Sequence, residues 1–210
     1  MSKSVLFEAD WRLKVDPLAE RDDIFAPRIA LLTEALKTSG NRLTILDAAC
    51  ASGSFAAFFR AQYHRVVPCD ISFTALTLVR RHHLIADGVA CTVEELPLKD
   101  QTFDAVWFGE SLALLENVHA ALSEFNRVLK PGGSMAMYCF SMDHPPPTFG
   151  DRHTFRFRIG NSHVESMDVP EAAVAYEEAF LFKVASETGF RSAEMIFAPD
   201  DWQPMLLCRK

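Results

Sequence analysis

Asp47 is the first residue whose position in the sequence suggests ligand chemistry. It ends a short apolar run, residues 43–46, and small side chains then lead to Gly53 before an apolar segment begins at Phe55. This pattern predicts a buried strand, a tight turn and the start of a helix. Small residues let a ligand lie against the backbone, and unpaired N–H groups at a helix start face it. Because open α/β sheets bind ligands beyond the carboxyl ends of their strands, we expect a cofactor site here.

Asp70 ends a second apolar run, residues 66–69, and stands 23 residues after Asp47. A carboxylate at the end of a second strand can accept hydrogen bonds from both hydroxyls of a ribose, as it does in dinucleotide-binding folds. The separation also fits a strand–helix–strand unit. We therefore interpret Asp70 as a ribose ligand, with Ile71 beside it in the same site. The alternative is that Asp70 only caps the next helix.

Residues 45–133 resemble the class I S-adenosylmethionine-dependent methyltransferases, in particular the small-molecule, type 11 group. Motif I of that family usually reads Asp-x-Gly-x-Gly-x-Gly, and this chain keeps the aspartate but only the last glycine. The four positions are Asp47, Ala49, Ala51 and Gly53. The resemblance implies S-adenosylmethionine as the cofactor, with residues 49–52, including Cys50, along its amino-acid part.

Residues 92–104 resemble the family stretch that often reads Asp-Ala-Glu-x-Leu-Pro-Phe-x-Asp-x-Ser-Phe-Asp. On that alignment Thr92 stands where an aspartate usually receives the adenine amino group, and Val93 is its apolar neighbour. A hydroxyl accepts a hydrogen bond without charge, so we expect weaker adenine recognition. Gly109, at the end of a later apolar run, would let the amino-acid part of the cofactor approach the backbone.

Residues 127–133, reading RVLKPGG, form the string most typical of the family. We interpret them as structural: cationic residues oppose the negative end of a helix dipole, Pro131 stops the helix, and two glycines turn into the next strand. Many relatives have a Leu-His-His-Leu-like run before this helix. Here residues 112–115 read LALL, so the imidazoles of that run are absent.

His144 is the candidate general base, and Glu110 is the second choice. Methyl transfer from a sulfonium mainly requires two partners in line and the exclusion of water, so a base is optional. His144 lies in a proline-rich loop after a predicted strand, with Asp143 as an orienting partner, whereas Glu110 follows the strand that ends at Gly109. The alternative for His144 is an exposed loop residue without a catalytic role.

The hydrophobic pattern predicts one α/β domain: a Rossmann-like, doubly wound, seven-stranded sheet that is mostly parallel, with an antiparallel last strand. We divide it into an N-terminal helical cap, a cofactor-binding core, a substrate-side insertion with a hairpin, and a closing helix with strands, at residues 1–41, 42–140, 141–175 and 176–210. Helices are expected at 26–38, 54–63, 73–87, 118–129 and 170–188, and strands at 43–47, 65–72, 89–93, 105–109, 134–140, 193–198 and 204–209. The expected hairpin pairs 154–159 with 162–167.

The overall composition favours small-molecule chemistry. Among 210 residues 49% are hydrophobic and 23% are charged, and the net charge of -7 argues against nucleic acid or anionic membranes as partners. With no signal-like start and no long apolar run, we expect a cytoplasmic protein. The five cysteines are widely spaced, so we expect reduced buried thiols and no metal site. A homodimer is compatible with the sequence.

Three hypotheses for function follow. The first is S-adenosylmethionine-dependent methyl transfer to a small organic molecule. The second is a methyltransferase fold that has lost or redirected methyl transfer, for example a cyclase or rearrangement enzyme, since Ala49, Ala51 and Thr92 all depart from the family pattern. The third is a non-catalytic partner subunit.

Overall fold

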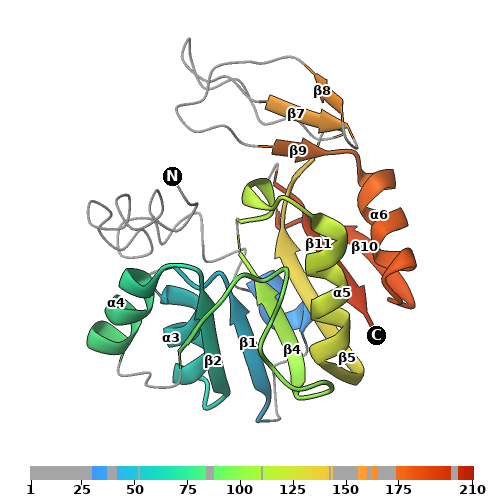
Figure 1. Ribbon diagram of the computed structural model, residues 1–210. Helices are drawn as coiled ribbons and strands as arrows, with labels where there is room; N and C mark the ends of the chain where they lie inside the picture. The colour runs from blue at the N-terminus through green and yellow to red at the C-terminus, as the bar shows by residue number, and fades with distance from the viewer. Residues whose placement is uncertain are drawn as a thin grey trace.

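A seven-stranded sheet forms the centre of the computed structural model, which describes residues 30–36, 42–51, 53–83, 88–109, 111–141, 143, 156–159, 162–164, 174–199 and 203–210 (Figure 1). The strand order is β10-β11-β5-β4-β1-β2-β3. The strands are β1 Thr44–Ala48, β2 Arg65–Asp70, β3 Val89–Ala90, β4 Phe103–Phe108, β5 Leu129–Tyr138, β10 Ser192–Ile196 and β11 Met205–Arg209. Strands β1 to β5 pair in parallel, while β11 is antiparallel to both β5 and β10. The predicted fold class is confirmed.

Helices cover both faces of this sheet, as the doubly wound pattern requires. Helices α3 (Ser54–Ala61) and α4 (Phe73–His83) lie on one face with the helical residues 30–35, and α5 (Val118–Val128) and α6 (Glu178–Glu187) lie on the other. Alternate strand residues feed two apolar cores, so Ile45 packs toward α3 and Leu46 toward α5. A short 3-10 helix, η2, spans Leu112–Leu114. The rest of the predicted first helix lies outside the described residues, as do 84–87 of the predicted third.

A second, four-stranded sheet lies beyond the carboxyl end of β5 (Figure 1). Strands β7 (Arg156–Ile159) and β8 (Ser162–Val164) pair antiparallel, which confirms the predicted hairpin. Strand β9 (Val174–Tyr176) joins them to β6 (Phe140–Ser141). The prediction of a helix starting at 170 was therefore wrong for residues 174–176, because Val174 and Tyr176 are residue types that favour strands and this segment pairs with β6 and β7.

The junction between α5 and β5 also differs from the prediction. The helix ends at Val128, before Pro131 could stop it, because Leu129 is already extended and begins β5. Gly133 sits inside that strand, where a Cβ would approach the carbonyl oxygens of Asp104 and Lys130 to 3.0 Å. The glycine therefore permits a close backbone approach within the strand.

Within the described residues no helix combines the length and the apolar character needed to cross a membrane. The same residues hold no group of three or more His, Cys, Asp or Glu arranged to bind a metal ion.

Candidate cofactor-binding site

The turn after β1 has an unusual backbone. Ala49 and Ala51 have φ values of 53° and 51°, and Gly53 has a φ of 84°, so three alternate residues lie in the left-handed region. This region costs a non-glycine residue about 1–2 kcal/mol. The alanines thus adopt the backbone conformation that glycine adopts freely. The tight turn predicted from the small residues is confirmed, and its backbone strain is a feature that the sequence did not reveal.

Hydrogen bonds to the end of β2 hold this turn in place. The N–H of Cys50 donates to the Cys69 carbonyl oxygen at 2.9 Å, and the N–H of Ala51 donates to Oδ2 of Asp70 at 2.9 Å. The N–H of Gly53 donates to the Cys50 carbonyl oxygen at 2.8 Å. Gly53 is the N-cap of α3 and supplies no side chain to its first turn. The N–H of Ala56, in that turn, donates to Asp47. That a ligand faces the start of α3 stays a prediction.

Asp70 is buried and connects two backbone segments. Its Oδ2 accepts from Ala51, and its Oδ1 accepts the N–H of Ser72 at 2.8 Å. The hydroxyl oxygen of Ser72 accepts the N–H of Ala75 at 3.0 Å, so Ser72 rather than Asp70 caps α4. Asp70 thus shapes the turn. Its role as a ribose ligand stays a prediction.

Asp47 lies beneath the turn and is fully buried. Burial, and after it the charge of Asp70, raises the pKa of Asp47 to about 8, against a smaller lowering by the backbone N–H of Ala56. Its Oδ2 has no hydrogen-bond partner among the described residues. A buried acceptor without a partner costs free energy, so this atom marks a place where a donor from a ligand fits.

The residues predicted to border the adenine follow β3. The hydroxyl oxygen of Thr92 accepts the N–H of Glu94 at 3.3 Å, and Val93 is buried. Ile71, at the end of β2, is 38% exposed and Phe73 is 73% exposed. Strand β3 is shorter than predicted and ends at Ala90, because Thr92 already belongs to a turn. The Thr92 oxygen is therefore partly engaged within the protein.

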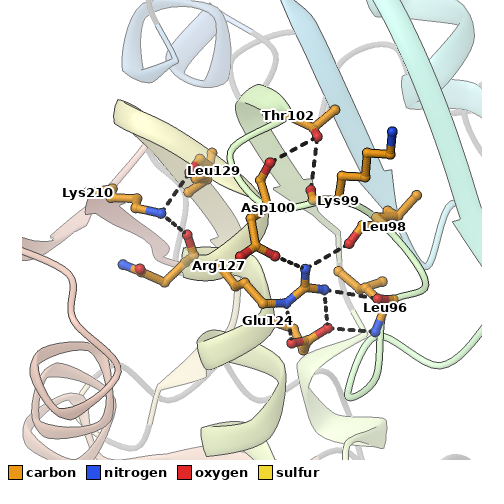
Figure 2. Close-up of polar contacts among 10 residues, drawn as sticks. Leu96, Leu98, Lys99, Asp100, Thr102, Glu124, Arg127, Leu129 and Lys210 are labelled. Atoms are coloured by element: carbon orange, nitrogen blue, oxygen red, sulfur yellow. Dashed lines mark hydrogen bonds and ion pairs between the residues drawn. The ribbon is translucent and has the colours of Figure 1, made fainter.

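A polar network holds the loop that carries Thr92 and Val93 (Figure 2). The guanidinium of Arg127 donates to the carbonyl oxygens of Leu96 and Leu98 at 2.9 and 2.7 Å, and to Glu124 and Asp100. Glu124 in turn accepts the N–H of Leu96 at 2.8 Å. Arg127 lies in the last turn of α5, as the structural role predicted for it requires, and its side chain in addition binds this loop.

A second positive charge at the carboxyl end of α5 comes from Lys210. Lys210 Nζ donates to the carbonyl oxygens of Asn126 and Leu129, at 2.6 and 2.8 Å, whereas Lys130 pairs with Asp104 at 2.7 Å. Lys210 therefore interacts with the negative end of the helix dipole, the role that the sequence assigned to the cationic residues of the 127–133 string.

Gly109 follows the last residue of β4, and Trp107 lies two residues before it. A Cβ on Gly109 would meet Nε1 of Trp107 at 3.6 Å, an ordinary contact distance. The Trp107 side chain is fully buried, and its Nε1 has no partner among the described residues. Sequence reasoning missed this residue, because a tryptophan in an apolar run predicts only core packing.

The two candidate bases, His144 and Glu110, lie outside the described residues. Asp143, predicted to orient His144, accepts the N–H of Glu178 at the start of α6 at 3.1 Å. This bond gives the Asp143 carboxylate a structural role at the first turn of α6.

Three cysteines surround the site, and all five of the chain are free. Cys50 and Cys69 are buried, and Cys91 is partly buried. The Cys69 thiol donates to Cys91, which lowers the pKa of Cys91 and raises the pKa of Cys69. The prediction of reduced, largely buried thiols agrees with this arrangement.

Comparison with known proteins identifies the family. Residues 46–137 match the family described as "Methyltransferase domain". The chain is 31% identical over 159 residues to the ubiquinone/menaquinone biosynthesis C-methyltransferase UbiE of Desulfotalea psychrophila, covering 72% of this chain and 61% of that one. It is 38% identical over 101 residues to the demethylmenaquinone methyltransferase of Streptomyces avermitilis, covering 48% and 43%. The chain thus spans about half the length of these curated relatives.

Two solved structures share the fold at lower identity. One is the 1,6-didemethyltoxoflavin-N1-methyltransferase of Burkholderia thailandensis with bound 1,6-didemethyltoxoflavin and S-adenosylhomocysteine (TM-score 0.61, 20% identity, 98% of this chain and 84% of that one). The other is the [4+2]-cyclase SpnF (TM-score 0.61, 22% identity, 81% and 61%). With the strand order and the turn after β1, these matches lead to one conclusion: the chain belongs to the class I S-adenosylmethionine-dependent methyltransferase family.

Proposed function

We propose that this protein binds S-adenosylmethionine above the turn after β1 and transfers its methyl group to a small organic molecule. The observation that carries the proposal is the backbone of that turn. Ala49 and Ala51 keep left-handed φ values despite their strain, which is the conformation suited to the glycines usual at these positions. A strained conformation is retained where surrounding contacts require it, and such strain is concentrated at functional sites.

The described residues fit this cofactor. The unpaired Oδ2 of Asp47 offers an acceptor to an ammonium group, and the start of α3 offers N–H groups. On this proposal Asp47 and residues 49–53 hold the amino-acid part, and Gly109 borders it. Asp70 and Ile71 hold the ribose, and Thr92 and Val93 border the adenine.

The chemical work of the chain is to position two reactants. The cofactor, when bound, supplies an activated methyl group. The protein then has to align an acceptor with that group and keep water away, which the buried surroundings of Asp47 and Asp70 favour on the cofactor side. The segment 141–175, with its small sheet, would border the acceptor. His144 and Glu110 remain our candidates for deprotonating an acceptor that needs a base.

A redirected activity is the second candidate, and two observations favour it. Ala49 and Ala51 carry methyl groups where the family usually has glycine, and Thr92 replaces a charged acceptor with a hydroxyl that already accepts the N–H of Glu94. A protein of this fold, the [4+2]-cyclase SpnF, bears the name of a different reaction. A non-catalytic partner subunit is the third candidate.

Calorimetry on the purified protein tests the first proposal. Mass spectrometry first checks for ligand carried through purification, and S-adenosylmethionine and S-adenosylhomocysteine are then titrated separately. Micromolar binding of both, followed by transfer of a labelled methyl group to an acceptor from a panel of quinones and carboxylic acids, is the expected result. A folded sample that binds neither ligand would contradict the proposal. Binding without transfer to any acceptor would favour the redirected activity.

Asp70→Asn provides the residue-level test, with Asp104→Asn as its matched control. Asp104 is a partly buried carboxylate that, like Asp70, accepts a backbone N–H, here from Thr44 at 2.8 Å, but it lies near the amino ends of β1 and β4. We expect weaker S-adenosylhomocysteine binding in Asp70→Asn and unchanged binding in Asp104→Asn. Equal affinity in both variants would contradict the ribose assignment.

A further inference from the structure

Trp107 has a buried polar group that the proposed function does not use. Its ring packs between Phe55, at a centroid distance of 4.7 Å, and Tyr138, at 5.5 Å. The side chain is fully buried, yet its Nε1–H has no acceptor among the described residues. Buried indole N–H groups usually find a partner, and leaving one unpaired destabilises the protein. A hydrogen-bond acceptor on a bound ligand would satisfy this N–H.

The position of Trp107 in the sheet brings it beside Asp47. The two residues are register partners in the parallel pair β1 and β4, so their side chains leave the sheet on the same face. Asp47 Oδ2 is also buried and unpaired. An unpaired donor and an unpaired acceptor therefore occupy neighbouring strands at the same level of the sheet.

The polar edge of the indole faces the ligand side of the sheet. Strand β4 ends at Phe108, so Gly109 is the first residue beyond the carboxyl end. A Cβ built on Gly109 would lie 3.6 Å from Nε1 and 3.8 Å from Cζ2 of Trp107. This edge of the ring, carrying the N–H, thus lies next to the point where the chain leaves the sheet, and Gly109 has no side chain to stand between the N–H and a ligand there.

We propose that Trp107 is a cofactor-binding residue: its indole N–H donates to the carboxylate of the amino-acid end of the cofactor, directly or through one water, while Asp47 accepts from the ammonium. The inference rests on the proposed function and assigns a further residue to it. An α-amino acid carries one acceptor group and one donor group on the same carbon. Trp107 and Asp47 present the complementary donor and acceptor on adjacent strands.

Two ligands separate this contact from the rest of the site. S-adenosylhomocysteine contains the amino-acid end, whereas 5′-methylthioadenosine keeps the adenosine and the thioether and lacks that end. Calorimetry on Trp107→Phe should show S-adenosylhomocysteine binding weakened about tenfold, the effect expected for one hydrogen bond to a charged group. Binding of 5′-methylthioadenosine should be unchanged.

Gly109→Ala is a second variant that leaves the indole in place. Its methyl group would meet Trp107 at an ordinary contact distance, so the fold is preserved, but the group would cover the N–H. We expect the same loss for S-adenosylhomocysteine alone. The chain contains three tryptophans, so the indole N–H signals of nitrogen-15-labelled protein are few, and Trp107→Phe assigns the relevant one. That signal should shift when S-adenosylhomocysteine is added and stay in place with 5′-methylthioadenosine.

The outcomes distinguish the two proposals. If the wild type binds both ligands but Trp107→Phe and Gly109→Ala bind S-adenosylhomocysteine as the wild type does, the role of Trp107 is refuted and the proposed function stands. An equal loss of both ligands in Trp107→Phe, with an unmoved indole signal in the wild type, would make Trp107 a packing residue. If the wild type binds neither ligand, the proposed function fails and the inference fails with it.

Discussion

Replacing Asp47 with asparagine should stabilise this protein, and increasingly so as the pH rises. Burial and the charge of Asp70 raise the pKa of Asp47 from 3.8 to about 8 in the folded state. Between these two values the unfolded chain has released the proton and the folded chain keeps it. Raising the pH therefore favours the unfolded state of the wild type, whereas asparagine does not titrate.

The magnitude follows from the linkage between proton binding and folding. Each pH unit between the unfolded and folded pKa values changes the free energy of unfolding by about 1.4 kcal/mol. From pH 5 to pH 7, the stability advantage of Asp47→Asn over the wild type should therefore grow by about 2.7 kcal/mol. The advantage should vanish below the unfolded pKa of 3.8 and stop growing above about pH 8.

Urea unfolding at pH 5, 6, 7 and 9 measures this difference, because titrations common to both proteins cancel. Glu34→Gln serves as the control, since it removes a carboxylate from an exposed position on the helix at residues 30–35. The advantage of Asp47→Asn should grow with pH by more than any change seen in this control. If the advantage of Asp47→Asn were constant from pH 5 to pH 9, Asp47 would not be the proton-retaining group inferred here.

Three further predictions concern the turn, the adenine and the loop network. Ala51→Gly should raise the free energy of unfolding by about 0.5–1 kcal/mol in urea titrations, because relief of left-handed strain outweighs the entropy cost of glycine. The control is Ala57→Gly within helix α3, which should destabilise the protein. Thr92→Asp should tighten S-adenosylhomocysteine binding about fivefold in calorimetry, because it supplies a charged acceptor, and unchanged affinity would contradict an adenine near this residue. Arg127→Met should destabilise the protein by about 2–3 kcal/mol in thermal or urea unfolding, because the carbonyls of Leu96 and Leu98 and the Glu124 carboxylate lose the guanidinium as donor. A loss of stability below about 0.5 kcal/mol, roughly that of a surface substitution, would refute this role.

Most of the sheet could be predicted from the sequence, because each strand and helix of the core has its own local pattern. The apolar run of β1, the acid near its end and the small residues after it are all visible within about ten positions. The prediction failed for elements whose secondary structure depends on strand partners that are distant in the sequence. Val174–Tyr176 was predicted as part of a helix, whereas it forms a strand whose partners β6 and β7 are separate in the sequence.

Some features of the candidate site could likewise be predicted from the sequence, and others could not. Asp47, Asp70 and the turn could be found from the sequence, because their residue types follow apolar runs at a recognisable spacing. The sequence could not show that Ala49 and Ala51 are strained, that Asp70 holds the N–H of Ala51, or that Trp107 lies beside Asp47. These facts depend on strand register, which brings together residues 19 and 60 positions apart in the chain (70 − 51 and 107 − 47). By itself the sequence therefore determined the order of the strands and helices and the ligand-binding turn, while only the tertiary structure decided which polar atoms are buried and which of them lack a partner.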